Sequence, residues 1–204
     1  MHGAKKQAGL RNPTEELILT VLSQNTSDIN RDRAYESLRK RYPAWEIVVS
    51  AGASNVARAI RAGGLANIKS KRIIKILKQI NQRSADYSLA FLKDMADDEV
   101  WDYLRGFEGV GPKTASCVMM FSLGRSTMPV DTHVHRVGTR LGLIPEGCNA
   151  EKAHGWFREL SLTVDAYQLH LNLISHGRTL CRPKNPKCGQ CPLTRECRYY
   201  RTAD

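Results

Sequence analysis

The sequence contains no long apolar segment. No run approaches the roughly 20 consecutive apolar residues that a membrane-spanning helix requires, and residues 1–13 carry no hydrophobic signal region. Internal repeats, low-complexity tracts and strand-like alternation of apolar and polar residues are also absent. These absences exclude a transmembrane protein and favour an all-α fold, and we expect a cytoplasmic protein.

Acidic residues are scarce relative to basic ones. The 204 residues include 31 lysines and arginines but only 20 aspartates and glutamates, which gives a net charge of +11. The pI is near 9.6, and such a charge favours a polyanionic partner. Charge alone does not separate nucleic acid from an anionic membrane surface.

Apolar residues at helical spacing predict a series of short helices. We expect helices at residues 14–23, 29–41, 43–51, 53–62, 69–78, 97–105, 132–141, 150–160 and 164–175, and one starting at Pro112. In the helix at 69–78 the isoleucines and a leucine should face the core. Its basic residues should form a solvated face, made of Lys69, Lys71, Arg72, Lys75 and Lys78.

A glycine-rich hairpin separates two predicted helices at the centre of the chain. The segment 107–111 (FEGVG) follows the helix at 97–105, and Pro112 is a natural first residue for the next helix. Gly109 and Gly111 allow backbone angles and close approaches that other residues do not. The amides of such a hairpin and of the following helix start can bind a phosphate oxygen of a nucleic-acid backbone. The alternative is a turn without a ligand.

Lys113 and Asp131 are both expected at the N-terminal end of a helix, which disfavours the positive charge of a lysine and favours the negative charge of an aspartate. Lys113 falls in the first turn of a helix, where the macrodipole disfavours a cation. An exposed lysine there would be a small defect, whereas partial burial would lower its pKa toward the range in which the free amine is a nucleophile. Asp131 is the expected N-cap of the helix at 132–141, where an anion is stabilised. Together they could attack an electron-poor carbon and stabilise the positive charge that develops. The alternatives are a phosphate-binding lysine and a purely structural cap.

Four cysteines lie close together near the C-terminus. They follow the spacing C-x6-C-x2-C-x5-C and are Cys181, Cys188, Cys191 and Cys197. In an intracellular chain this group predicts a metal site rather than disulfides. Zinc is the generic interpretation, and one CxxC flanked by longer loops is also compatible with a cubane iron–sulfur cluster. We interpret Cys117 as a small buried helix residue and assign no role to Cys148.

The hairpin FEGVGPKTA, the VDTH segment after it and the four-cysteine tail together resemble the endonuclease III family of DNA glycosylases. The resemblance covers nearly the whole chain. It implies that Lys113 is the catalytic nucleophile, that Asp131 is essential and that the four cysteines hold a 4Fe–4S cluster. Two residues depart from the family pattern: Glu108 stands where proline is common, and Pro112 stands where a basic residue is frequent. Glu108 puts a carboxylate beside the proposed phosphate site.

The resemblance also implies which residues enter the DNA duplex. Asn25, or else Gln24, matches the amide side chain that fills the gap left by an extruded base, and Leu65 matches a leucine that wedges into the duplex. His133 belongs to the VDTH segment and is expected to help fill the gap. From the residues alone, the segment around Asn25 fits an N-cap loop equally well, and Leu65 fits a helix-cap contact.

The four-cysteine segment is strongly basic. Residues 178–201 contain seven basic residues and one acid, and Arg182, Lys184 and Lys187 lie in the loop between the first two cysteines. So short and polar a segment cannot pack a core of its own. We therefore expect the metal to fix the loop and the three cations to contact DNA phosphates.

These features predict an all-α helix-hairpin-helix glycosylase fold with two helical lobes. The predicted division consists of a flexible lead at 1–13, a terminal lobe at 14–28 and 131–204 that contains the cluster loop 181–197, and a second lobe at 29–130 that contains the helix-hairpin-helix at 97–123.

The predicted function is a bifunctional DNA glycosylase and abasic-site lyase of base-excision repair, acting on oxidised or damaged pyrimidines in duplex DNA. One alternative is a monofunctional glycosylase for mismatched or alkylated bases, against which Lys113 argues. Another is a non-catalytic, DNA-binding iron–sulfur redox module, against which Lys113 and Asp131 together argue. We expect a monomeric, nucleoid-associated protein of prokaryotic origin.

Overall fold

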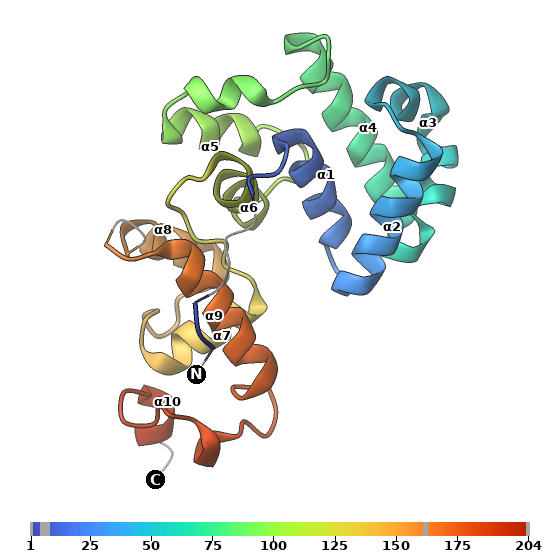
Figure 1. The fold of residues 1–204 in the computed structure, drawn as a ribbon. Coiled ribbons are helices and arrows are strands. Elements are labelled where there is room, and N and C mark those ends of the chain that lie inside the picture. The colour runs from blue at the N-terminus through green and yellow to red at the C-terminus, as the bar shows by residue number, and fades with distance from the viewer. Residues whose placement is uncertain (1, 5–8, 161–162, 203–204) are drawn as a thin grey trace. The chain divides into compact units, whose positions relative to one another are not determined.

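The computed structural model describes residues 2–4, 9–160 and 163–202. Within these ranges every regular element is a helix, which confirms the predicted all-α class (Figure 1). None of the helices described there has both the length and the apolar character needed to cross a membrane.

The chain divides into two compact units. Unit 1 comprises Met1–Gly9 and Arg125–Asp204, and unit 2 comprises Leu10–Gly124. Unit 2 therefore includes residues 14–28, whereas the sequence-based division groups them with the C-terminal lobe. That division stays a prediction, and residues 1 and 5–8 of its lead lie outside the described residues.

Unit 2 contains six α-helices and two short 3₁₀ helices among its described residues. Their bounds are α1 Pro13–Ser23, α2 Asp28–Arg41, α3 Trp45–Ala59, η1 Arg61–Gly63, α4 Ala66–Arg83, η2 Ala90–Asp94, α5 Asp97–Arg105 and α6 Pro112–Leu123. The predicted helix at 97–105 is confirmed at both bounds, and the one predicted to start at Pro112 does so. The side chain of Asn12 caps α1 by accepting from the amides of residues 14 and 15.

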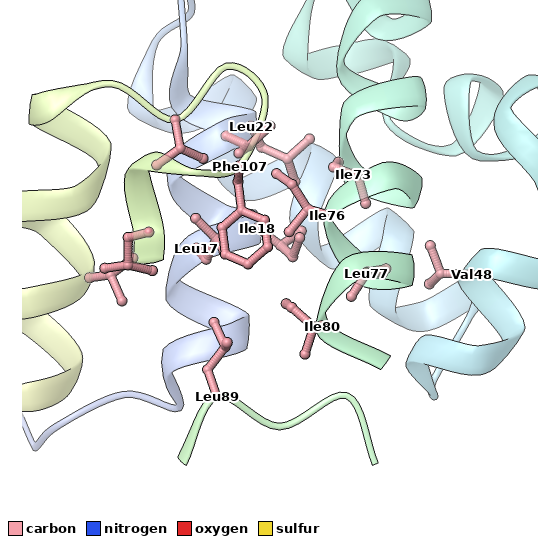
Figure 2. Close-up of a cluster of buried hydrophobic side chains, with 14 of the residues drawn as sticks. Leu17, Ile18, Leu22, Val48, Ile73, Ile76, Leu77, Ile80, Leu89 and Phe107 are labelled. Atoms are coloured by element: carbon pink, nitrogen blue, oxygen red, sulfur yellow. The ribbon is translucent and has the colours of Figure 1, made fainter. Parts of the chain in front are cut away.

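The core of unit 2 includes buried residues from all six of its α-helices, with α1 and α4 among the main contributors. Apolar residues recur at helical spacing on both helices and are fully buried, as with Leu17 and Ile18 on α1 and Ile76 and Ile80 on α4. Figure 2 shows Phe107, from the segment after α5, lying among these side chains. Burying this aromatic ring holds the start of the hairpin against the core.

Helix α3 combines the two short helices that the sequence predicts at 43–51 and 53–62. Gly52 interrupts it with φ 76° and ψ 161°, which lie outside the helical region of backbone angles. The kink therefore marks the predicted boundary between the two helices.

The prediction for the helix at 69–78 was wrong about Lys69, and its bounds were too narrow. Helix α4 is longer, running from Ala66 to Arg83, and Lys69 is 1% exposed rather than solvated. Its Nζ donates hydrogen bonds of 2.7 Å to the carbonyl oxygens of Leu22 and Gly63. The carbonyl oxygens at the ends of two neighbouring helices thus replace water around this ammonium group.

Unit 1 contains the remaining helices. Their bounds are α7 Thr132–Leu141, α8 Ala150–Leu160, α9 Ala166–Thr179, η3 Cys188–Gln190 and α10 Arg198–Arg201. Val134 and Val137 of α7, Phe157 of α8 and Leu173 of α9 belong to one buried cluster. The predictions at 132–141 and 150–160 are confirmed, and the helix predicted at 164–175 is shifted toward the C-terminus.

Candidate functional site

The hairpin between α5 and α6 uses its two glycines differently. Gly109 has φ +75°, and a Cβ atom there would lie 1.9 Å from Nε of Arg72. Gly111 has φ −90° and ψ −178°, which any residue adopts, and a Cβ atom there would meet nothing within 4 Å. The backbone therefore requires glycine at position 109, whereas at position 111 the absence of a side chain leaves open space.

Side chains from two other segments hold the hairpin in place. Gln24 Nε2 donates to the Gly109 carbonyl oxygen at 3.1 Å, and Arg72 Nη1 donates to Gln24 Oε1 at 2.5 Å. Glu108 forms an ion pair with Lys75 of α4. The hydrogen bond and the charge of Lys75 lower the pKa of Glu108, so the extra carboxylate is ionised and has a cation beside it.

Lys113 lies in the first turn of α6, as predicted, with Gly111 as the N-cap and Pro112 as the first helical residue. Its side chain is partly buried, and its Nζ lies 3.5 Å from Ser23 Oγ at the end of α1. The Ser23 hydroxyl itself donates to the Thr20 carbonyl oxygen at 2.7 Å. The amine is therefore held beside the hairpin and the end of α1 while keeping access to solvent.

Asn25 and Leu65 share an unusual backbone conformation. Their φ angles are 51° and 49°, in the left-handed region that few residues other than glycine adopt and that asparagine tolerates better than leucine. Asn25 is exposed, and the Leu65 side chain is 50% exposed immediately before α4. Gln24, the other predicted gap-filling residue, is instead bound to the hairpin.

Asp131 belongs to unit 1, whereas Lys113 belongs to unit 2. As predicted, Asp131 is the N-cap of α7, and its Oδ1 accepts a hydrogen bond of 2.7 Å from the Val134 amide. Two residues later, His133 Nδ1 lies 3.1 Å from Arg136 Nη2. A Cβ atom at Gly177 of α9 would come within 3.1 Å of His133, so the histidine packs closely on α9.

The four predicted metal-binding cysteines line one cavity in unit 1. Its wall also includes Arg140, His176, Tyr199 and Tyr200. Among the described residues, no three His, Cys, Asp or Glu side chains converge in the way required by one metal ion. The donor set fits a thiolate-bound cofactor, because four thiols surround a common space and thiolates are the usual ligands of such groups.

Two arginines of α7 that belong to none of the predicted motifs contact the start of the four-cysteine loop at 181–197, called the cysteine loop below. Arg136 Nε donates to the Cys181 carbonyl oxygen at 3.0 Å. Arg140 Nη1 lies 3.3 Å from Cys181 Sγ and donates to the Arg182 carbonyl oxygen at 2.7 Å. Their spacing of four residues on one helix was the available signal, since such residues share a helix face.

The loop between Cys181 and Cys188 carries three basic residues, whose contact with DNA stays a prediction. Arg182, Lys184 and Lys187 are all exposed, between two cysteines that line the cavity. The Lys187 amide donates to the Leu180 carbonyl oxygen at 2.9 Å, which closes the base of the loop. Of the two other cysteines, Cys117 is buried in α6, as predicted, and Cys148 is half-buried.

Comparisons with known proteins agree on one family. The profile of the HhH-GPD superfamily base excision DNA repair protein matches residues 18–160. The chain is 30% identical over 194 residues to an endonuclease III of Sulfolobus acidocaldarius, covering 93% of this chain and 83% of that protein. It is 33% identical over 184 residues to an endonuclease III of Rickettsia conorii, covering 90% and 83%.

A candidate DNA glycosylase of Arabidopsis thaliana is 36% identical over 173 residues, which make up 82% of this chain. The chain spans 59% of that protein's length and 10% of the length of a rice protein, ROS1C. Among solved structures, a non-covalent endonuclease III–DNA complex is similar, with a TM-score of 0.80 and 27% identity. The similarity covers 97% of this chain and 88% of that one.

Proposed function

Because the chain belongs to the HhH-GPD superfamily of base excision DNA repair proteins, we propose that it is a bifunctional DNA glycosylase and abasic-site lyase. Its proposed substrates are oxidised or otherwise damaged pyrimidines in duplex DNA. The observation that carries the proposal is the position of Lys113. This amine lies in the first turn of α6, directly after a glycine hairpin and 3.5 Å from Ser23 Oγ.

Lys113 supplies the nucleophile of the proposed reaction. The damaged nucleotide first leaves the base stack, because C1′ is out of reach inside the duplex. Nζ then forms a bond to C1′, the bond from C1′ to the base breaks, and the base leaves with the electron pair and takes up a proton. Opening of the sugar ring yields a Schiff base, loss of a C2′ proton expels the 3′ phosphate, and hydrolysis returns the amine.

Asp131 stabilises positive charge on the sugar during this reaction. Its Oδ1 accepts a hydrogen bond from the Val134 amide, which fixes the carboxyl group at the start of α7. Electrostatic stabilisation by a fixed carboxylate acts mainly in the transition state. The second oxygen of the carboxylate provides the charge that the proposal requires.

The hairpin binds the DNA backbone in this proposal. The open space at Gly111 allows a phosphate oxygen to approach the amides at the start of α6. The Lys75–Glu108 pair supports this role because it places a cation beside the one carboxylate of the hairpin. Such contacts position the duplex without reading its sequence.

Asn25, Leu65 and His133 are the residues proposed to occupy the duplex where the base has left. The exposure of Asn25 and Leu65 supports this role, and so does their strained backbone. Gln24 is assigned to holding the hairpin instead, because its amide already bridges Gly109 and Arg72.

A 4Fe–4S cluster would be held by the thiolates of Cys181, Cys188, Cys191 and Cys197. When bound, it would fix the loop through its bonds to these four side chains. The loop's exposed cations, Arg182, Lys184 and Lys187, would then contact phosphates. We further propose that the protein acts on double-stranded DNA as a monomer. Its proposed location is the cytoplasm of a prokaryote, in association with the nucleoid.

Borohydride trapping on abasic DNA tests the central assignment. The reagent reduces a Schiff base and leaves a covalent protein–DNA adduct. The wild-type protein should give this adduct, and Lys113→Gln should abolish it while keeping duplex binding, because the variant lacks the nucleophilic amine. Lys78→Gln, which removes the same charge from an exposed site on α4, is the matched control.

A normal adduct yield from Lys113→Gln would refute Lys113 as the nucleophile. A cleavage panel should accompany the trapping experiment, with oxidised pyrimidine, oxidised guanine, uracil mismatch and abasic duplexes. Base release without strand cleavage would favour a monofunctional glycosylase, and no reaction on any duplex would favour a non-catalytic DNA-binding protein.

A further inference from the structure

Lys69 is an unusual residue for the interior of unit 2. It is 1% exposed and is one of the largest fully buried side chains. Burial lowers its pKa, and the nearby charge of Arg72 acts in the same direction. No ion pair with a carboxylate compensates it among the described residues. Burying a lysine costs free energy of desolvation, so we expect Lys69 to have a role besides packing.

The two hydrogen bonds of Lys69 join segments that are far apart in the sequence. Nζ donates at 2.7 Å to the carbonyl oxygen of Leu22, in the last turn of α1. It donates at the same distance to the carbonyl oxygen of Gly63, the last residue of η1. Both acceptors lie at helix ends, where the backbone carbonyls have no partner within the helix and attract a cation.

Each acceptor lies just before one of the strained residues. Leu22 precedes Asn25 by three positions, and Gly63 precedes Leu65 by two. Both Asn25 and Leu65 have positive φ. Such strain persists only where the surrounding structure fixes the backbone, and Lys69 binds the backbone on the N-terminal side of both residues.

We propose that Lys69 is a positioning residue that sets the separation between Asn25 and Leu65 and so controls their joint entry into the duplex. The inference rests on the proposed function, because it takes these two residues to fill the gap left by an extruded base. Lys69 itself touches neither DNA nor the reacting atoms. Its loss should therefore slow base extrusion and leave the later chemistry intact.

Single-turnover excision from two duplexes separates extrusion from chemistry. In one, an oxidised pyrimidine pairs with its complementary purine, so the enzyme must extrude the base and fill the gap. In the other, the same lesion is a one-nucleotide bulge, which costs little to extrude and leaves no partner base to separate from. Strand cleavage at a preformed abasic site provides a third substrate that has no base at all.

Lys69→Met keeps the length of the side chain and removes its hydrogen bonds. The variant should excise the paired lesion about 10- to 100-fold more slowly, the range expected when positioning is lost. Excision from the bulge and cleavage at the abasic site should stay within about threefold of the wild type. Lys78→Met removes the same charge from an exposed site on α4 and should leave all three rates unchanged.

If the rates on all three substrates fall by the same factor while the circular dichroism spectrum stays normal, the proposal is overturned and Lys69 is a structural residue only. An unchanged rate on the paired lesion would also overturn it. If Lys69→Met does not fold, Lys69→Arg decides the question, since it keeps charged donors but moves them. A paired-to-bulged rate ratio equal to that of the wild type in Lys69→Arg would refute the role.

Amide hydrogen exchange provides a readout that does not depend on activity. Loss of the two hydrogen bonds should speed exchange selectively at residues 23–27 and 61–66. Unchanged exchange in these segments would overturn the proposed clamp. If the wild-type protein is inactive on every duplex, the proposed function itself has failed, whereas the exchange experiment still reports whether Lys69 fixes the two segments.

Discussion

Arg72 and Gln24 form a hydrogen bond of 2.5 Å between Nη1 and Oε1, which joins α4 to the residue that follows α1. Gln24 Nε2 in turn donates a hydrogen bond to the Gly109 carbonyl oxygen. The hairpin is thus held by a chain of polar contacts in addition to the buried ring of Phe107. This arrangement leaves no room for a side chain at position 109.

The two hairpin glycines should respond differently to substitution by alanine. Gly109→Ala should lower the free energy of unfolding by about 1–3 kcal/mol, because it strains the positive φ and displaces Arg72 from Gln24. Gly111→Ala should cost less than about 1 kcal/mol but weaken duplex binding, because its methyl group fills the space proposed for a phosphate. Denaturant unfolding and duplex affinity measure the two effects.

Each glycine variant serves as the control for the other. Equal stability of the two proteins would contradict the steric requirement at Gly109. Undiminished DNA affinity of Gly111→Ala would mean that the open space beside the start of α6 is not used by phosphate.

Asp131→Asn should separate the structural role of this residue from its proposed catalytic one. The asparagine oxygen can still accept the Val134 amide, so the melting temperature should change little. Single-turnover base excision should fall about 10²- to 10³-fold, because the neutral amide does not stabilise charge on the sugar. Near-normal excision would reduce Asp131 to a helix cap.

The purified protein should be brown, with broad absorbance near ~400 nm and about four irons per chain. Cys191→Ser should lose most of this absorbance, since Cys191 lines the cysteine cavity, whereas Cys148→Ser should retain it. Iron analysis and absorbance check both variants. A colourless protein, purified without air and carrying one zinc ion, would refute the cluster.

Neutralising Arg182, Lys184 and Lys187 should weaken binding to damaged and undamaged duplexes by similar factors. The slope of log affinity against log salt should fall by roughly one for each DNA phosphate that the variant no longer neutralises. Excision at saturating enzyme should hardly change, because none of the three is proposed to touch the sugar or the base. Affinity measured against salt concentration, paired with single-turnover rates, tests this.

A second triple variant controls for the removal of three charges. It neutralises Arg33, Lys40 and Lys78, which are exposed on α2 and α4, and it should keep the wild-type slope. Identical slopes for both triple variants and the wild type would mean that the loop cations are merely solvated. A collapsed rate with intact binding would contradict the assigned active site.

Local sequence features were sufficient to predict much of the fold. The acidic start and apolar spacing of α5, the proline that begins α6 and the aspartate that caps α7 each act within one or two helical turns. Helices α5 and α7 match their predicted bounds at both ends, and α6 begins at the predicted residue. Gly52 likewise marks the interruption of α3 because its backbone angles are excluded from a helix.

Features that depend on contacts between distant segments could not be predicted in this way. Lys69 follows the spacing of the exposed basic face, and only the carbonyl oxygens of Leu22 and Gly63 explain its burial. Gly109 and Gly111 look equivalent in the sequence, but Arg72 lies against only one of them. The contacts of Arg140 with the cysteine loop likewise join residues some forty positions apart.

The order of the two units along the chain has a consequence for biosynthesis. Unit 2 is continuous, so every residue of its core has been translated before the second segment of unit 1 is made. Domains generally fold as units, with those nearer the N-terminus first. Unit 2 can therefore fold on the ribosome before the second segment of unit 1, Arg125–Asp204, has been translated. Residues 181–197 are synthesised after the buried residues of both cores. Insertion of the proposed cluster would therefore fall late in maturation, on a chain whose other unit is already folded.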